Sequence, residues 1–489
     1  MAPASSPETE ARAAAVFALL PFAVLTFVVT VTTVGKTTRL LAGLTYYLIP
    51  ETDAERARAR LAQVQSQNAA ARRKEKRRKG GGLASLTQEN DEDSIAALKL
   101  TKANLVLKPF WSHYDHLVFF TVAVATNWVA AEARAAWIHA RIADGSVPET
   151  EPVVLENPLL ALMCVVGVGS ASRALALMQL DSATPGIEKA LAGAVAVAGF
   201  VASSLLLMLV PASVLDFEMD RTSVEFAPAL VGAIRRKAGR ALGGAFGGDR
   251  SKATGSGSLV VSRAQIAVGL SVFAGILAGS LFPPAVRASR SYLMQTAPPM
   301  WSESVTRADA KSRRVAHFAF AAPLVAAASF VSPLFAEPLG LGPATVAAAR
   351  PAALLVTALS LMCSVPCLVQ GHLNGSLVAW YELKFGSQNG GATRAAARAK
   401  AEVTNHVAVK VAVQAAAPAA LMACLACLLG AKRHLDPSEA ERASLTGMIP
   451  AACWRTIAGF LGWWVAACWG AFTTLGVALG RNGVAPFAP

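Results

Sequence analysis

The chain carries its densest charge in the run RRKEKRRK, residues 72–79, which is followed by three glycines at 80–82. Between Lys36 and Lys108 there are 15 Lys or Arg and 8 Asp or Glu residues, so this stretch supplies about half of the formal net charge of +14. Basic loops beside membrane spans stay on the cytosolic side. If the neighbouring apolar stretches cross a membrane, this run therefore sets the direction of every later helix.

Outside this run the chain is strongly apolar. It is 54% hydrophobic and 16% charged, with a mean hydropathy of +0.45, values typical of polytopic membrane proteins. No basic recognition fold accompanies the charge, which argues against nucleic acid as a partner. We therefore predict an integral membrane protein of the plasma membrane or an endomembrane. Its expected partners are the lipid bilayer, including anionic lipid at the basic loop, and other membrane proteins or channels.

The apolar stretches predict an all-α fold, a polytopic membrane helix bundle with eight or nine transmembrane helices. A spanning helix needs about 20 largely apolar residues at about 1.5 Å each. The nine candidates are Ala13 to Val34, His116 to Ile138, Pro158 to Met178, Ala190 to Val214, Val260 to Pro283, Val315 to Phe335, Thr345 to Val369, Val407 to Leu429 and Thr456 to Leu479.

These spans divide the chain into seven regions. They are the N-terminal region and first span (1–34), a basic, partly disordered cytosolic loop (35–112), spans two to four (113–215), an amphipathic interfacial helix and Gly/Ser linker (216–258), spans five to seven (259–370), a cytosolic helical loop (371–405), and spans eight and nine with a short C-terminus (406–489). Nine spans place the N-terminus outside and the C-terminus in the cytosol. Only the basic residues near Arg235 disagree with this topology. We interpret them as part of an amphipathic helix along the interface, and a re-entrant course or a different placement of a neighbouring span would also remove the conflict.

Ionisable residues within spans are the candidate site residues, because each costs a few kcal/mol at the bilayer centre and usually faces protein or water. The candidates are Glu132, Arg173, Arg263 and Arg350, with Arg134 and Lys410 as further members. Their depths allow two pairings, Glu132 with Arg350, and Arg263 with Asp216 or Glu218. Arg173 lies about 12 Å inside its helix end, a long distance to snorkel. Structural pairing and a polar pathway both remain open for this set.

Motifs for catalysis are absent from the sequence. There is no Ser/His/Asp or Cys/His arrangement, no H-E-x-x-H and no nucleotide fingerprint. Cys424 and Cys427 form a C-x-x-C on one face of an apolar helix, where small packing residues are expected rather than a redox or metal pair. Gly275-x-x-x-Gly279 permits close helix contact within the bundle. We predict no enzymatic activity, no cofactor and no metal.

Several stretches resemble one known family. The last span reads GWWVAAC at 462–468, and Trp463, Trp464 and Cys468 within it resemble the final span of the transmembrane protein 161 family. Similar likenesses, in the same order, occur at 205–226, at 268–270, at Phe282-Pro283 with Arg287, at His372-Leu373, at 395–410 and at Pro418. The chain departs from the family at 386–391, where glycines interrupt a helix that is continuous in its relatives.

The resemblance implies a multi-pass membrane protein whose animal relatives are associated with cardiac rhythm, membrane currents and stress protection. It brings no established biochemical activity and no catalytic or binding residues. The sequence thus favours a non-enzymatic regulator of membrane ion currents or of partner membrane proteins. The alternative is a secondary transporter or channel with its own polar pathway.

Overall fold

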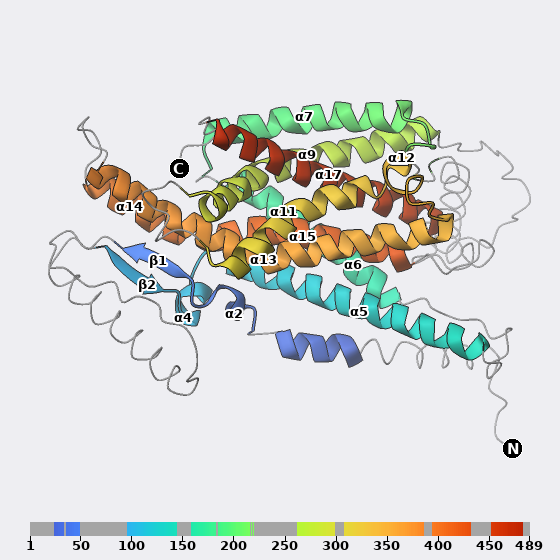
Figure 1. Cartoon of the computed structure of the whole chain (residues 1–489), viewed down its shortest axis with the longest axis horizontal. Helices are drawn as coiled ribbons and strands as arrows, with labels where there is room; N and C mark the ends of the chain where they lie inside the picture. The colour runs from blue at the N-terminus through green and yellow to red at the C-terminus, as the bar shows by residue number, and fades with distance from the viewer. Residues whose placement is uncertain are drawn as a thin grey trace, which may run out of the picture.

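The computed structural model describes residues 24–33, 36–48, 95–143, 158–181, 184–215, 217, 219, 262–298, 308–385, 394–431 and 451–482. Most of them lie in long helices that pack side by side into one bundle (Figure 1). The helices are α5 (Trp111–Ala143), α6 (Pro158–Leu180), α7 (Gly186–Leu209), α9 (Arg263–Thr296), α11 (Ala310–Ala328), α12 (Ser332–Phe335), α13 (Pro343–Phe385), α14 (Arg394–His406), α15 (Ala408–Ala431) and α17 (Ala451–Arg481). Residues 24–33 form a further helix ahead of these.

Among the described helices, eight are long and apolar enough to cross a membrane, which confirms the predicted polytopic bundle. The remaining predicted span, 315–335, corresponds to α11 and α12, which do not meet this criterion. The first turns of α11 carry three basic residues. Nevertheless α11 runs antiparallel along α13: the Cys367 thiol donates to the Ser312 carbonyl (3.9 Å), and Thr357 donates to the Ala322 carbonyl (3.1 Å).

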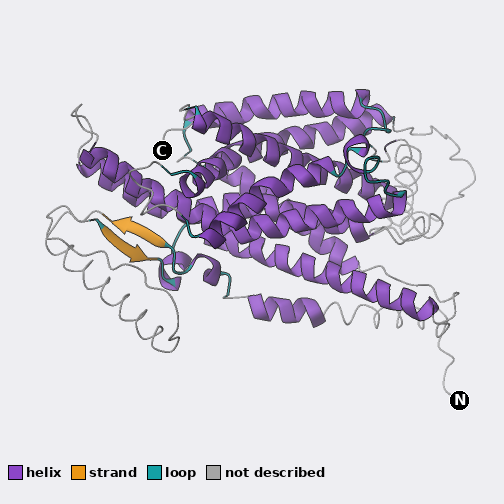
Figure 2. Ribbon diagram, in the orientation of Figure 1, coloured by secondary structure: helices purple, strands orange, loops and turns teal. Residues whose placement is uncertain are grey.

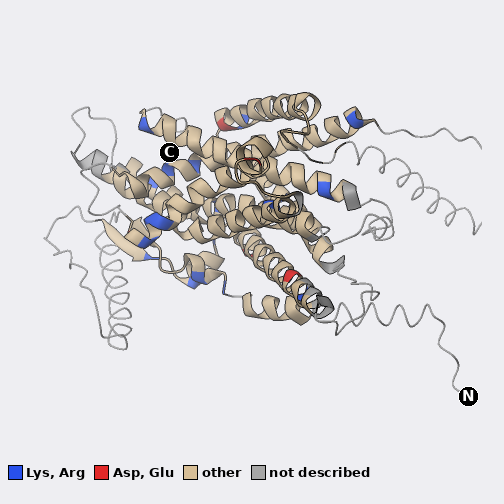
Figure 3. Cartoon of the chain, turned by 45° about the vertical axis from the view of Figure 1, so that its right-hand side comes forward, with Lys and Arg blue, Asp and Glu red and all other residues tan. Residues whose placement is uncertain are grey.

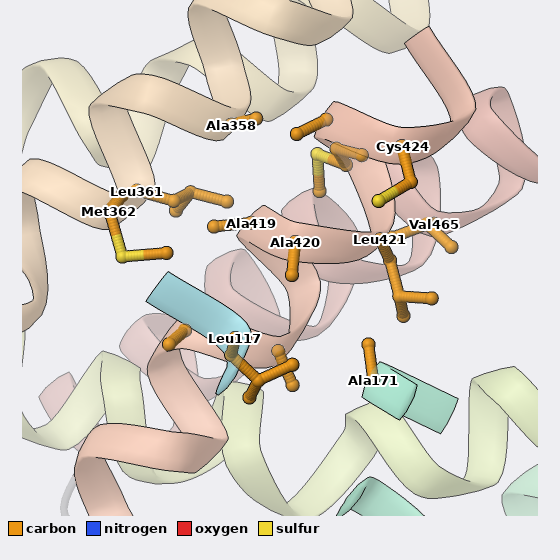
Figure 4. Close-up of a cluster of buried hydrophobic side chains, with 14 of the residues drawn as sticks. Leu117, Ala171, Ala358, Leu361, Met362, Ala419, Ala420, Leu421, Cys424 and Val465 are labelled. Atoms are coloured by element: carbon orange, nitrogen blue, oxygen red, sulfur yellow. The ribbon is translucent and has the colours of Figure 1, made fainter. Parts of the chain in front are cut away.

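Helix α15 lies at the centre of the bundle. All of its most apolar 18-residue window is buried, and α5, α6, α13 and α17 surround it. Figure 4 shows Ala419, Ala420 and Leu421 of α15 among side chains from these neighbours. Small alanines let the surrounding helix backbones approach closely without an intervening layer of large side chains. The axis of the bundle is therefore filled by protein.

The glycine pair predicted to allow close packing joins α7 to α9. A Cβ atom on Gly279 would lie 2.5 Å from the Ala192 carbonyl oxygen, and one on Gly275 would lie 2.7 Å from that of Ala196. Any side chain larger than hydrogen would push the two helices apart. The contact within the bundle explains the motif, as the sequence indicated.

One feature at the end of the bundle was not predicted, a small antiparallel sheet (Figure 2). Strands β1 (Thr45–Leu48) and β2 (Ala96–Lys99) pair Thr45 with Lys99 and Leu48 with Ala96, and the short helices α2 (Thr38–Leu41) and α4 (Lys102–Val106) flank them. Both strands fall in the region 35–112 that we expected to be a loop. Local periodicity could not reveal them because their pairing partner is distant in sequence.

Several predictions fall outside the described residues. They are the basic run at 72–79, almost all of the predicted amphipathic helix and linker at 216–258, and the glycine interruption at 386–391. Within the described part, α13 continues beyond the predicted span end at Val369, and α9 continues through Pro283 and Pro284 to Thr296. Membrane helices tolerate such prolines when neighbouring groups or water satisfy the freed carbonyls.

Candidate functional site: a polar belt at one end of the bundle

Few of the described helix residues are Lys, Arg, Asp or Glu (Figure 3). Several of the described charges nevertheless meet at one end of the bundle, where α6 ends and where α7 and α15 begin. We call Lys108, Asp181, Glu188, Arg287 and Lys410 the polar belt. Glu188, Arg287 and Lys410 belong to α7, α9 and α15, Asp181 directly follows α6, and Lys108 lies in the segment before α5. Their contacts therefore fix how the helix ends pack against one another.

The first contact of the belt joins α6 to α15. The ammonium group of Lys410 donates to Oδ2 of Asp181 (2.6 Å) and to the hydroxyl of Thr184 (3.3 Å). It also lies 5.7 Å from the centre of the Phe110 ring, within the range of a cation–π contact. The Lys410 side chain is only 10% exposed, so the charge is held by these partners rather than by water.

The second contact joins α7 to α9. Both carboxylate oxygens of Glu188 accept from Nη2 of Arg287 at 2.6 Å. Glu188 is 3% exposed and lies in the first turn of α7, where the helix dipole also favours a negative charge. Arg287 lies beyond the two prolines of α9, and it reaches Glu188 because α9 remains helical past them.

The third contact joins the segment before α5 to α14. Lys108 donates to the carbonyl of Asn405 and to its side-chain Oδ1 (2.8 Å). Burial lowers the pKa of the Lys108 ammonium group from its ordinary value, because desolvation penalises the charged form. The belt therefore extends from the bundle to the short elements that cap it.

The capping sheet is held to α13 by the side chain of Gln370. Its Oε1 accepts from the backbone N–H of Thr45 (2.8 Å) and its Nε2 donates to the Thr45 carbonyl (3.0 Å) and to Oδ1 of Asn374 (2.8 Å). The amide thus replaces a neighbouring strand at the edge of β1. Asn374 lies in the only N-x-S/T sequon of the chain and is 5% exposed, so its side chain is part of the packing.

The structure separates the four intramembrane candidates. Arg173 on α6 and Arg263 on α9 are exposed on the outside of the bundle. Arg173 acts electrostatically on His113, and Arg263 donates to the Leu207 carbonyl (3.4 Å). Asp216 and Glu218, the proposed partners of Arg263, are outside the described residues.

The remaining two candidates are half-buried. Arg350 donates to the Phe330 carbonyl (3.4 Å) and lies over the ring of the same residue (5.3 Å to its centre). Glu132 on α5 acts electrostatically on Cys427 of α15. The described contacts of the four candidates therefore lie in different places, and an ion pair between Glu132 and Arg350 stays a prediction.

The tryptophan pair of the last span links α17 to two neighbours. Adjacent helix positions point about 100° apart, so the two indoles diverge. Trp463 donates to the Ala327 carbonyl of α11 (3.1 Å), and Trp464 donates to the Ala274 carbonyl of α9 (2.9 Å). Cys468, one turn after Trp464, is buried. These residues have a structural role in this fold.

The C-x-x-C cysteines meet a third thiol. Cys164 of α6 lies within hydrogen-bonding reach of Cys424 and Cys427, and all three are buried. In the part of the chain that the structure describes, no group of three or more His, Cys, Asp or Glu residues is arranged to hold a metal ion. The three thiols fill space beside Gly167, whose missing side chain leaves room for the Cys424 sulfur.

Sequence reasoning had not assigned the ion pairs of the belt. The sequence marks Lys410 as an intramembrane cation but does not indicate Asp181 as its partner, and a fifth span that ends at Pro283 places Arg287 in a loop. Glu188 was not singled out. The sequence signal for each ion pair is an acidic residue near the end of one apolar stretch and a basic residue near the end of another. Only the packed structure shows which of these stretches are neighbours.

A bundle of eight long apolar helices, with a filled axis and paired charges at helix ends, is a multi-pass integral membrane protein. The chain belongs to the family described as predicted transmembrane protein 161AB, whose model matches residues 13–374. This confirms the resemblance seen in the sequence. Trp463, Trp464 and Cys468 lie beyond the matched residues, so their likeness to the family stays a prediction. No curated protein and no solved structure matches the chain.

Proposed function

We propose that this protein is a non-enzymatic regulator of membrane ion currents or of partner membrane proteins, in the plasma membrane or an endomembrane. The observation that supports this proposal is the filled axis: α15 is enclosed on all sides, and its central window is wholly buried. A protein that conducts ions through its own centre needs a polar, hydrated route there. The proposal assigns no catalytic residue, cofactor or metal.

The polar belt also supports a regulatory role. Its two ion pairs join α6 to α15 and α7 to α9, and Gln370 joins the capping sheet to α13. Helix ends tied in this way form a fixed platform to which another membrane protein can bind. With the basic run at 72–79 in the cytosol, the belt lies at the cytosolic end, because β1 and β2 directly flank the segment that carries the run (Figure 1). We expect this run to contact anionic lipid.

One observation favours the alternative, a transporter or channel. Tyr114 and Gln414 are buried, and the Tyr114 hydroxyl and Gln414 Oε1 have no hydrogen-bond partner among the described residues. They follow Phe110 and Lys410 by one turn, and these two residues are in contact. Buried polar atoms without partners are places where ordered water is commonly found. In this alternative, the polar pathway begins beside Lys410, at the Tyr114 hydroxyl and the Gln414 amide oxygen.

Reconstitution separates the two functions. The purified protein is placed in liposomes, and the flux of K⁺, Na⁺, Cl⁻ and protons is measured with and without the Gln414→Leu substitution. We expect no flux above that of empty liposomes, together with a changed whole-cell current on expression and a channel recovered by cross-linking in the intact membrane. Flux in the absence of partners that Gln414→Leu reduces would establish the transporter instead.

A further inference from the structure

A half-open crevice lies between α9, α11, α13 and α17, apart from the ion pairs of the belt. Ala288, Tyr292, Ala319, Leu361 and Trp469 are among its lining residues. The crevice is shallow, and its volume reaches about 330 Å³ only when the open space at its mouth is included. Three of the four hydroxyl groups in the lining, those of Ser289, Ser364 and Thr473, each donate to a carbonyl of their own helix, and the fourth, that of Tyr292, contacts His317. The interior of the crevice is therefore mostly hydrocarbon.

The rim of the crevice is polar and positively charged. The hydroxyl of Tyr292 lies 2.8 Å from Nδ1 of His317, and its ring stacks on Phe320 at 4.8 Å. Arg481, the last residue of α17, acts electrostatically on Tyr292. The rim thus brings together aromatic and cationic groups near the ends of α9 and α17, the arrangement found where membrane proteins meet lipid headgroups.

Arg313 supplies the observation that points to a ligand. It lies on α11 one turn before Ala316, which lines the crevice, although Arg313 is not itself a lining residue. Its Nε is buried and has no hydrogen-bond partner among the residues that the structure describes. A buried guanidinium donor with no acceptor is unfavourable, and a phosphate is the acceptor that its geometry suits best.

We propose that this crevice binds one anionic phospholipid, with an acyl chain between α9, α11 and α13 and the phosphate at the rim beside Arg313, Tyr292 and Arg481. The apolar interior matches the chain, and the positive rim matches the phosphate. A zwitterionic lipid of the same chain length fits the interior equally well but has no net charge for the rim. Preference for the anionic lipid is therefore the distinguishing property.

The proposal is tested with the full-length protein in nanodiscs of phosphatidylcholine. Each sample carries a trace of lipid with a photoactivatable diazirine in its acyl chain, either phosphatidylserine or phosphatidylcholine, and labelled peptides are mapped by mass spectrometry. We expect the serine lipid to label the crevice segments of α9, α11 and α13 preferentially. Ala319→Phe, which fills the crevice, should abolish this label, and Arg313→Gln should reduce it roughly fivefold, the effect of removing about one interfacial cation.

Lys189→Gln is the matched control, because Lys189 is an exposed cation on α7, which does not line the crevice. It should leave the label unchanged. Equal labelling by the two lipids, or labelling spread evenly over all lipid-facing helices, would overturn the proposal, as would an unchanged label in Arg313→Gln. If Ala319→Phe fails to assemble by size-exclusion chromatography, the Arg313→Gln result and the comparison of the two lipids decide the question.

Discussion

The Glu188–Arg287 pair makes an asymmetric prediction about stability. Arg287→Met leaves a carboxylate that is 3% exposed without its partner, whereas Glu188→Met leaves a guanidinium whose side chain is 29% exposed and can turn toward water. Breaking a buried pair costs about 3–5 kcal/mol, so we expect a loss in this range for Arg287→Met. For Glu188→Met, solvent screening reduces the expected loss to about 2 kcal/mol.

The double substitution should recover much of this loss. With both charges replaced by methionine no charge remains unpaired, and such replacements are commonly close to neutral. We therefore expect the double variant to lie within about 1 kcal/mol of the parent, which together with the single losses gives a coupling energy of about 4 kcal/mol or more from the double-mutant cycle. Lys189→Met, an exposed neighbour on α7, serves as the control and should change stability by less than about 0.5 kcal/mol.

The assay is reversible unfolding in mixed detergent micelles, followed by circular dichroism as the fraction of denaturing detergent rises. The four proteins of the cycle and the control are measured under the same conditions, so that the micelle contribution cancels. Additive losses in the double variant, with a coupling energy near zero, would refute the claim that this ion pair holds α7 to α9. Equal losses in the two single variants would refute the argument from their different burial.

Three further predictions concern packing and topology. Gly279→Val should lower the free energy of unfolding by about 1–3 kcal/mol or more, because a Cβ atom there meets the Ala192 carbonyl. Gly269→Val is the control and should have a smaller effect, because the space around Gly269 is open. The same unfolding assay compares the two variants. Trp464→Phe should cost about 1 kcal/mol by the same measurement, because its hydrogen bond to α9 is lost, and an unchanged stability would count against that bond. Glycosidase treatment of protein from eukaryotic cells should leave its electrophoretic mobility unchanged, because Asn374 is buried, and a shift that maps to Asn374 would contradict both the packing and the topology.

The helices could be predicted because apolar length is a local property of the sequence. The central span around Ala420 and the last span around Trp464 were found from composition alone, and both are long buried helices. The end of α9 was placed too early because Pro283 and Pro284 suggest a helix terminus, whereas the packed bundle tolerates them. This error assigned Arg287 to a loop and concealed its ion pair.

The contacts between elements could not be predicted in the same way. The pairing of β1 with β2, and of Glu188 with Arg287, depends on which segments are neighbours in space, and one sequence gives no measure of this. The candidates chosen for their cost in a bilayer are dispersed: Arg173 and Arg263 are exposed, and Arg350 donates to the Phe330 carbonyl. The free-energy cost of placing a charge in the bilayer marks these residues as unusual in the sequence. Their contact partners are visible only in the packed structure.

The capping sheet has a practical consequence for work on this protein. Because Leu48 pairs with Ala96, the two ends of the intervening segment are held side by side, and Gln370 fixes this point to α13. Doubling the length of a loop whose ends are already joined costs only about 0.6 kcal/mol in closure entropy. A fluorescent protein or affinity tag inserted between these strands should therefore leave the bundle intact, and the accessibility of such a tag to the cytosol would test the predicted topology.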